Sequence, residues 1–149
     1  MKISIVGNAE SIFENQYGDL IDSVDLVIRF NHGIPIKPKS QGTKTNILVF
    51  MNPGYKNKWP KNLTYWHTKD FPERTHIEEI IGAPASNGIV AFEKVKIKYP
   101  EATVRVFGFD WKKTGSFYMA ERAKTKHNYI NEKEYCLNLI KKQGWTLYQ

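Results

Sequence analysis

The sequence is short of the residues from which several common kinds of site are built. It contains one cysteine, Cys136, which excludes an intrachain disulfide and is compatible with a reducing compartment. No cluster of His and Cys has the spacing of a zinc site, and the P-loop, nucleophile-elbow and G-x-G-x-x-G patterns do not occur. A lone cysteine within a helical pattern is more typical of a core position than of a nucleophile.

Two further absences narrow the class of protein. No Asp-x-Asp pair occurs, which excludes the usual metal–diphosphate clamp of sugar-nucleotide transferases that depend on a divalent metal. No run approaches the ~20 apolar residues that span a bilayer, and the sequence begins with a strand pattern rather than a signal-peptide pattern. We therefore expect a cytoplasmic protein.

The composition is that of one folded domain. A chain of 149 residues, 41% of them hydrophobic, can bury a core without disulfides or metal, so we expect a single domain over 1–149. Twenty-two basic residues against fifteen acidic ones give a net charge of +7. This excess favours an anionic partner such as a nucleotide, an acidic glycan, nucleic acid or a membrane surface. The lysines are scattered, which is more typical of a solvated face than of a binding stripe.

Short apolar runs alternate with helical patterns along the chain. The apolar runs predict strands at 3–6, 26–28, 46–51, 63–67, 104–109 and 145–148. The helical patterns predict helices at 73–81, which Gly82 would end, at 88–99, and at 132–142, which Gly144 would end. They also predict a short helix or crossing loop at 11–21. In the helix after Gly88 the apolar positions include Ile97. This alternation predicts an α/β fold with a mainly parallel, twisted, Rossmann-like sheet flanked by helices.

Two of the predicted strands end in an asparagine. Gly7-Asn8 follows the first strand, and Asn31 closes the second. In open α/β sheets ligands bind outside the carboxyl ends of the strands. Gly7 would let the backbone approach a ligand closely, and Asn8 offers both a donor and an acceptor, a combination that suits a nucleotide. Ordinary turn chemistry would place the same residues there, and Asn31 could instead cap the loop that follows.

Two features in the second half of the chain could carry chemistry. Ser86-Asn87-Gly88 lies at a helix N-terminus, where free N–H groups and the helix dipole favour an anion. A plain N-cap, with Ser86 or Asn87 as the capping residue, is the alternative. His127 precedes Glu132 by five positions, and a histidine near a carboxylate makes a sound general base. An isolated surface histidine beside a helix N-cap is the commoner case.

Taken together, these segments resemble the sialyltransferases of glycosyltransferase family 29. The family's large sialylmotif is similar to three stretches of this chain: Val6-Gly7-Asn8, Ile21-Asp22-Ser23-x-Asp25-x-Val27-Ile28-Arg29-x-Asn31 and Gly42-x-Lys44-Thr45. Its small sialylmotif, which usually reads Ser-Thr-Gly at its centre, is similar to two later stretches: Pro84-x-Ser86-Asn87-Gly88 and Gly108-Phe109. His127 and Glu132 match its very small motif, H-x4-E.

The resemblance implies a GT-A-like fold without a metal, a CMP-activated donor and inversion at the anomeric carbon. It assigns donor binding to residues of the first two motifs: Gly7, Asn8, Arg29, Asn31, Ser86, Asn87, Gly88 and Phe109. In this interpretation Asn8 and Asn31 hold the CMP moiety, and the Ser-Asn-Gly turn contacts its ribose and base. The resemblance also makes His127 the base that deprotonates the acceptor hydroxyl, while Glu132 orients the site.

The chain departs from the family in its third motif. That motif places a His-Tyr pair ahead of the catalytic histidine, and its histidine contributes to the donor phosphate. Residues 111–126 contain no histidine. Tyr118 is the nearest candidate for a catalytic role there, and Lys112, Lys113 or Arg122 could supply the charge. The cysteine pair that joins the large and small motifs in secreted members is also missing, as expected for a reducing cytoplasm.

These observations favour one hypothesis and leave two others open. We expect a metal-independent transferase that moves sialic acid, or a related acidic sugar such as Kdo, from CMP to a hydroxyl of a glycan or glycolipid. Hydrogen bonds and a helix dipole could stabilise a leaving group with a single phosphate without Mg²⁺. The expected setting is a bacterial cell or a host infected by a phage or virus. The alternatives are a CMP- or nucleotide-binding module without turnover, and a glycosyltransferase that modifies DNA, which the positive charge permits.

Overall fold

Six parallel strands form one sheet at the centre of the molecule. The computed structural model describes residues 1–119 and 125–149. The strands follow the order β4-β3-β2-β1-β5-β6, and each neighbouring pair is parallel. Their bounds are β1 Lys2–Val6, β2 Leu26–Phe30, β3 Ile47–Phe50, β4 Thr64–His67, β5 Thr103–Phe107 and β6 Thr146–Tyr148. The predicted α/β fold with a parallel sheet is confirmed.

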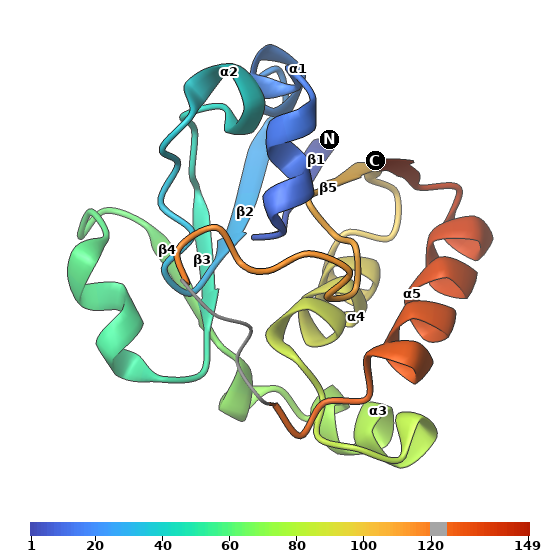
Figure 1. Cartoon of the computed structure of the whole chain (residues 1–149). Coiled ribbons are helices and arrows are strands. Elements are labelled where there is room, and N and C mark those ends of the chain that lie inside the picture. The colour runs from blue at the N-terminus through green and yellow to red at the C-terminus, as the bar shows by residue number, and fades with distance from the viewer. Residues whose placement is uncertain (120–124) are drawn as a thin grey trace.

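Helices lie on both sides of this sheet (Figure 1). The α-helices are α1 Gly18–Asp22, α2 Pro38–Gln41, α3 Glu73–Ile81, α4 Asn87–Lys98 and α5 Tyr129–Gln143. The described residues also form 3-10 helices at η1 Glu10–Glu14, η2 Pro53–Lys58 and η3 Thr68–Asp70. Gly82 and Gly144 end α3 and α5 in the left-handed conformation, as the sequence predicted, because glycine adopts it without steric cost. Within the described ranges, no helix is long and apolar enough to cross a membrane.

Three details differ from the sequence-based expectation. Helix α5 begins at Tyr129 rather than at Glu132, because the Asn128 side chain accepts a hydrogen bond from the Asn131 N–H at 3.1 Å and caps it. Strand β5 ends at Phe107, before the turn that follows it. Ile97 was expected on the inner face of α4, but its side chain is 52% exposed. It lies two residues beyond the buried Val95, which at 3.6 residues per turn is the opposite side of the helix.

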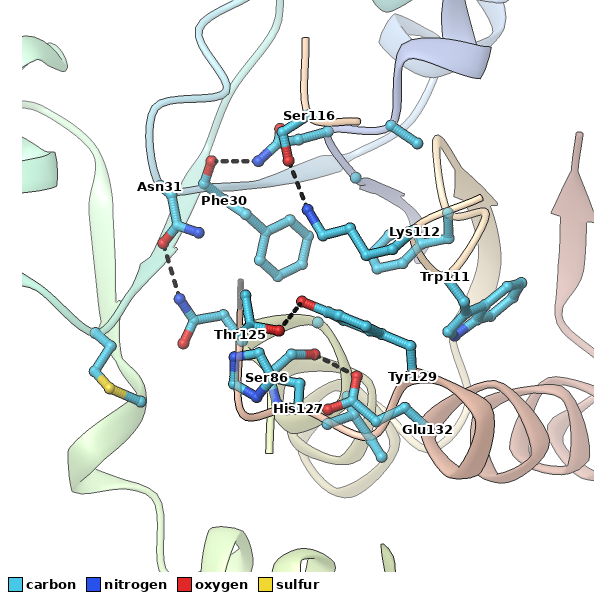
Figure 2. Close-up of a pocket in the computed structure, with 18 of the residues that line it drawn as sticks. Phe30, Asn31, Ser86, Trp111, Lys112, Ser116, Thr125, His127, Tyr129 and Glu132 are labelled. Carbon is cyan, nitrogen blue, oxygen red and sulfur yellow. Dashed lines mark hydrogen bonds between the residues drawn. The ribbon is translucent and has the colours of Figure 1, made fainter. Parts of the chain in front are cut away.

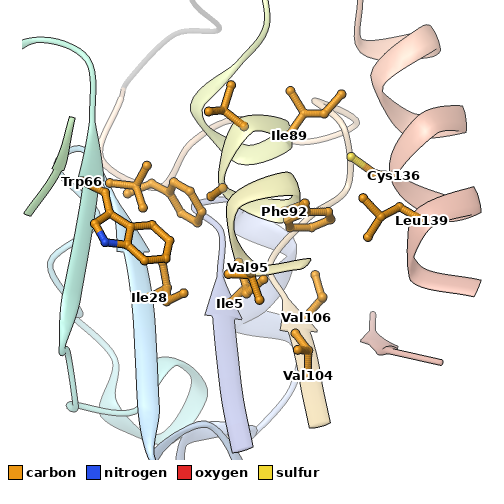
Figure 3. Packing of buried hydrophobic residues seen from close by; sticks show 14 of the residues in the cluster. Ile5, Ile28, Trp66, Ile89, Phe92, Val95, Val104, Val106, Cys136 and Leu139 are labelled. Carbon is orange, nitrogen blue, oxygen red and sulfur yellow. The ribbon is translucent and has the colours of Figure 1, made fainter. Parts of the chain in front are cut away.

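One face of the sheet covers a large hydrophobic cluster, and the other face covers two smaller ones. Successive side chains of a strand point to opposite faces, so Ile5 joins the larger cluster and Val6 one of the smaller ones. The larger cluster includes the buried faces of α3, α4 and α5. Figure 3 shows Ile5 of β1 close to Val95 of α4, with Phe92 of the same helix above the strands. The cluster that contains Val6 packs under η1 and α1.

The strand order determines where a ligand site can form. From β1 the chain first builds β2, β3 and β4 on one side, then returns to add β5 and β6 on the other. The order therefore reverses between β1 and β5, and ligands of open α/β sheets bind at such a switch point. The Gly7 N–H donates to the Phe107 carbonyl at 2.7 Å, so the segments that leave the two strands begin side by side.

Candidate active site

A cavity of about 670 Å³ opens at this switch point, a volume typical of small-molecule sites. Ten of the residues proposed for the site line it: Gly7, Asn8, Asn31, Ser86, Asn87, Gly88, Phe109, Tyr118, His127 and Glu132. They come from the ends of β1, β2 and β5, from α4 and α5 and from the loops between them, so segments far apart in the sequence share one cavity (Figure 2).

Asn8 and Asn31 form one side of the cavity, which we call the strand-end wall. The Asn8 Nδ2 donates to the Phe30 carbonyl at 3.0 Å and lies 3.4 Å from the Tyr118 hydroxyl. A Cβ at Gly33 would lie 2.1 Å from the Asn8 Oδ1, so a glycine there leaves room for this amide. The Asn8 side chain therefore has a defined orientation, which the backbone on both sides of it maintains.

Asn31 is held more tightly still. Its φ of 53° lies in the left-handed region, which asparagine tolerates better than most residues. The Trp59 Nε1 donates to its carbonyl at 2.7 Å, and the Asn87 Nδ2 donates to its Oδ1 at 2.8 Å. Figure 2 shows the Asn31 amide nitrogen turned toward the cavity. The side chain of Asn87 thus orients Asn31, and its contact with the ribose or base of the donor stays a prediction.

The floor of the cavity is the ring of Phe109. It packs against Phe30 and Phe92, with ring centroids 5.7 and 5.0 Å apart. A Cβ at Gly88 would come within 2.8 Å of this ring, and one at Gly7 within 2.9 Å. Both motif glycines are therefore needed for the ring to lie where it does.

Ser86, His127 and Glu132 form the opposite side, which we call the helix wall. Glu132 is 2% exposed and accepts two hydrogen bonds from Ser86, from its N–H at 2.8 Å and from its hydroxyl at 2.7 Å. Ser86 occupies the N-cap position of α4, but its hydroxyl is directed to Glu132 instead of capping the helix. Burial raises the pKa of the Glu132 carboxyl, and the hydrogen bonds from Ser86 partly oppose that rise.

One ring nitrogen of His127 forms a hydrogen bond with the backbone. Its Nδ1 lies 2.6 Å from the carbonyl oxygen of Pro84, a group that can only accept a hydrogen bond. Nδ1 therefore carries the proton, and in the neutral ring Nε2 is left with a lone pair. A histidine held in this tautomer can take a proton from a hydroxyl group bound at Nε2.

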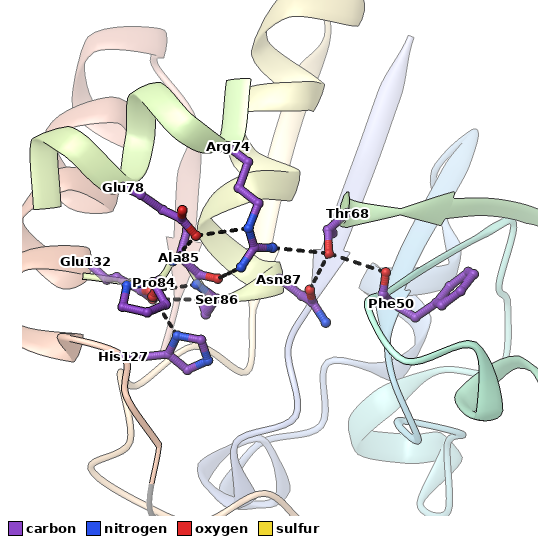
Figure 4. A network of polar contacts seen from close by, with 10 residues as sticks. All are labelled: Phe50, Thr68, Arg74, Glu78, Pro84, Ala85, Ser86, Asn87, His127 and Glu132. Atoms are coloured by element: carbon purple, nitrogen blue, oxygen red, sulfur yellow. Dashed lines mark hydrogen bonds and ion pairs between the residues drawn. The ribbon is translucent and has the colours of Figure 1, made fainter. Parts of the chain in front are cut away.

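Helix α3 holds the turn that supplies the Pro84 carbonyl (Figure 4). Arg74 donates to the Ala85 carbonyl at 3.0 Å and to the Glu78 carboxylate at 2.9 Å. Glu78 in turn accepts the Ala85 N–H at 3.0 Å. These contacts fix Ala85, which lies between Pro84 and Ser86. They therefore hold the Pro84 carbonyl, which contacts His127, at a constant distance from Ser86, which donates to Glu132.

The first half of the chain, which carries the strand-end wall, matches a known family. Residues 2–81 match the model of glycosyltransferase family 29 (sialyltransferase), which is more than half of the chain. The chain belongs to glycosyltransferase family 29. A β-1,6-galactosyltransferase from Arabidopsis thaliana is 42% identical to it over 48 residues. That match covers 32% of the family-29 chain but 12% of the curated relative, so the chain spans a small part of that protein's length.

Solved structures share the fold of this family-29 chain. A mammalian sialyltransferase in complex with Gal-beta-1-3GalNAc-ortho-nitrophenol superposes with a TM-score of 0.69 and 14% sequence identity. A second crystal structure of a mammalian sialyltransferase gives a TM-score of 0.62 and 16% identity. Each alignment covers 99% of the chain and 68% of the structure compared. At these identities the likeness establishes a common fold.

Arg29 corrects one of the sequence-based expectations for the family-29 site. It was expected to contact the donor, but its side chain is 1% exposed and does not line the cavity. It donates instead to the Gln41 carbonyl at 2.7 Å and to the Thr45 hydroxyl at 3.0 Å. Burial lowers the pKa of Arg29 to about 10, so it stays charged at neutral pH. The residue braces the loop after α2, because its position in β2 directs the side chain toward that loop.

Asp22 has a similar structural role in the same motif. Its carboxylate accepts the Thr43 N–H at 2.7 Å and the Lys44 N–H at 3.0 Å. Gly42, at a φ of 66°, leaves room for that carboxylate, since a Cβ there would lie 2.3 Å from it. The large motif of the family-29 chain therefore contributes both the strand-end wall and the scaffold behind it.

The third-motif region supplies further lining residues. Tyr118 faces Asn8, and burial raises the pKa of its hydroxyl. Lys112 also lines the cavity, whereas Lys113 lines a second, smaller cavity. Arg122 lies outside the described residues.

Tyr129 and Thr125 are among the lining residues that were missed at the sequence level. Tyr129 and Thr125 form a hydrogen bond of 3.1 Å beside His127. Their closeness to the predicted base in the sequence was the one signal that pointed to them. Among the residues that the structure describes, no three His, Cys, Asp or Glu side chains are grouped so that they could hold a metal ion.

Proposed function

We propose that the chain is a metal-independent, inverting glycosyltransferase that moves sialic acid, or a related acidic sugar such as Kdo, from a CMP-sugar to a hydroxyl of a glycan acceptor. The observation that carries the proposal is the contact between the His127 Nδ1 and the Pro84 carbonyl. It leaves Nε2 as a proton acceptor in a cavity whose other side presents two asparagine amides. Family membership supports a transferase.

The proposed reaction is a single displacement. The acceptor hydroxyl gives its proton to the His127 Nε2 as its oxygen forms a bond to the anomeric carbon. The bond from that carbon to the phosphate oxygen breaks, and its electron pair leaves with CMP. The imidazolium that forms is stabilised by the Pro84 carbonyl and by the nearby Glu132, whose charge interacts with His127. Attack from the side opposite the leaving group inverts the anomeric centre.

The donor phosphate would lie near the N-terminus of α4. The first N–H groups of a helix have no partner within the helix, and its dipole favours an anion there. Asn87, Gly88 and Ile89 of this first turn line the cavity. CMP carries one phosphate, so fixed dipoles and hydrogen bonds can stabilise its departure without a divalent ion.

A second candidate is a galactosyltransferase. It rests on the 42% identity over 48 residues to a protein named as a β-1,6-galactosyltransferase. The two candidates share the base and the acceptor step and differ in the nucleotide and the sugar of the donor.

Calorimetric titration of the full chain separates them. CMP, CDP, UDP and GDP are titrated in EDTA, and CMP-sialic acid, CMP-Kdo and UDP-galactose are then offered as donors with a panel of glycan acceptors. Selective binding of CMP in EDTA, followed by release of CMP, is the expected result. Selective binding of UDP and turnover of UDP-galactose would favour the second candidate. A strict need for Mn²⁺ would contradict metal independence.

A further inference from the structure

The backbone after β5 is strained where it meets the cavity. Trp111 and Lys112 are consecutive residues with φ of 51° and 67°, and neither is a glycine. Both line the cavity. Residues other than glycine rarely adopt this backbone conformation. It persists where surrounding contacts enforce it, often at functional sites. The strained pair at the cavity is therefore a candidate for a functional role.

Asp110 ties this segment to the chain after β1. Its carboxylate accepts the Ser11 hydroxyl at 3.1 Å, and the Thr114 N–H and hydroxyl at 3.0 and 2.5 Å. The Glu10 N–H donates to the Gly115 carbonyl at 3.0 Å. The loop that carries Lys112 is thus closed on itself and fastened to the neighbouring segment, so the left-handed pair is enforced from outside.

The ammonium group of Lys112 is directed to the strand-end wall. Its Nζ donates to the Ser116 hydroxyl at 2.8 Å, and Ser116 is 7% exposed. The Ser116 side chain also lies close to Tyr118, which faces Asn8. On its other side the Nζ lies 6.0 Å from the centroid of the Tyr129 ring. Figure 2 shows the Lys112 side chain extended between Ser116 and Tyr129, with the helix wall below it.

We propose that Lys112 neutralises the charge that develops on the nucleotide phosphate as it leaves, a catalytic role that rests on the proposed transferase function. When the bond from the anomeric carbon to the phosphate oxygen breaks, the electron pair stays on that oxygen and the phosphate gains one negative charge. The ammonium of Lys112 offsets this charge by a charge-assisted hydrogen bond and keeps its own proton. Among the described residues that line the cavity, the other lysine is Lys69, which is exposed.

The test compares a ligand that carries the phosphate with one that lacks it. Affinities of the full chain for CMP and for cytidine are measured for the wild type and for Lys112→Met, Lys112→Asn and Lys112→Arg. Lys112→Asn removes the charge with a residue that tolerates the left-handed backbone, which guards against a variant that only misfolds. Lys113→Met is the matched control, because it removes an adjacent charge outside the cavity.

We expect CMP affinity to fall about 10- to 100-fold in Lys112→Met and Lys112→Asn while cytidine affinity stays unchanged. The rate constant kcat for donor turnover should fall by about 10²- to 10³-fold, the scale of a lost transition-state contact. Lys112→Arg should retain most of both. If the wild type binds CMP and both neutral variants keep its preference for CMP over cytidine, the role of Lys112 is overturned and the transferase proposal stands. If the wild type does not bind CMP, both fail.

Discussion

The two walls of the cavity are built by different means. On the strand-end wall, Asn8 and Asn31 follow neighbouring strands, and backbone groups and glycines fix their amides. On the helix wall, Glu132 reaches Ser86 across 46 positions of sequence, and one carbonyl orients His127. The first wall presents fixed hydrogen-bonding groups and the second a proton acceptor. Changes to the first should therefore weaken donor binding, and changes to the second should slow turnover.

The largest effect is expected on the helix wall. His127→Ala removes the proposed base, so the transfer rate should fall by about 10²- to 10⁴-fold while CMP affinity stays close to that of the wild type. Single-turnover assays and CMP titration measure the two quantities separately. His76→Ala, an exposed change on α3, is the control. Wild-type turnover in His127→Ala would show that the helix wall does not hold the base.

A substitution at Arg29 tests whether this residue stabilises the fold behind the strand-end wall without binding the donor. Arg29→Met leaves the carbonyl and hydroxyl that it binds without a donor, which should cost about 2–5 kcal/mol in the free energy of unfolding. Urea denaturation checks this. Arg105→Met on β5 is the matched control, since Arg105 makes longer contacts of 3.3 and 3.4 Å and should cost much less. If Arg29→Met kept its stability but lost CMP affinity, that result would indicate that Arg29 contacts the donor.

A smaller effect is expected for the strand-end wall itself. Asn8→Ala should weaken CMP binding by about 10-fold, the value of one hydrogen bond to a ligand. Gly33→Ala should do the same indirectly, because the new methyl group would displace the Asn8 amide. The double variant should therefore be no worse than either single one, a failure of additivity that titration can measure. Asn62→Ala, at an exposed site, is the control. Full additivity would mean that Gly33 acts by another route.

The smallest effect concerns the pH dependence of stability. Burial raises the pKa of Glu132 above its unfolded value, so the stability linked to this group is present at low pH and lost as the pH rises through the raised pKa. Glu132→Gln removes the titrating group, so the free energy of unfolding should depend less on pH in that window. Denaturation at several pH values checks this against Glu134→Gln, an exposed change on α5. Equal slopes in both variants would contradict the assignment.

Local chemistry explains which parts of the fold could be predicted. The β-branched runs predicted the parallel strands, and glycines at 82 and 144 marked the ends of α3 and α5, because both signals act within a few residues. The predicted start of α5 was wrong because the Asn128 side chain caps the helix three residues earlier than the predicted start, at Tyr129. Ile97 was predicted on the inner face of α4 because it lies close to the helical spacing of the apolar positions. Which of those positions face the sheet depends on how the helix is rotated about its axis, and that rotation is set by packing.

The order of the amino acids by itself predicted the class of the sheet, the asparagines that follow β1 and β2, and three motifs that resemble those of family 29. The packed structure was needed to show that Arg29 braces a loop, that Glu132 accepts two hydrogen bonds from Ser86, and that the His127 Nδ1 contacts the Pro84 carbonyl. Strand runs and helix ends arise from interactions between near neighbours. The direction of a side chain and the identity of its partner depend instead on which distant segments pack beside it.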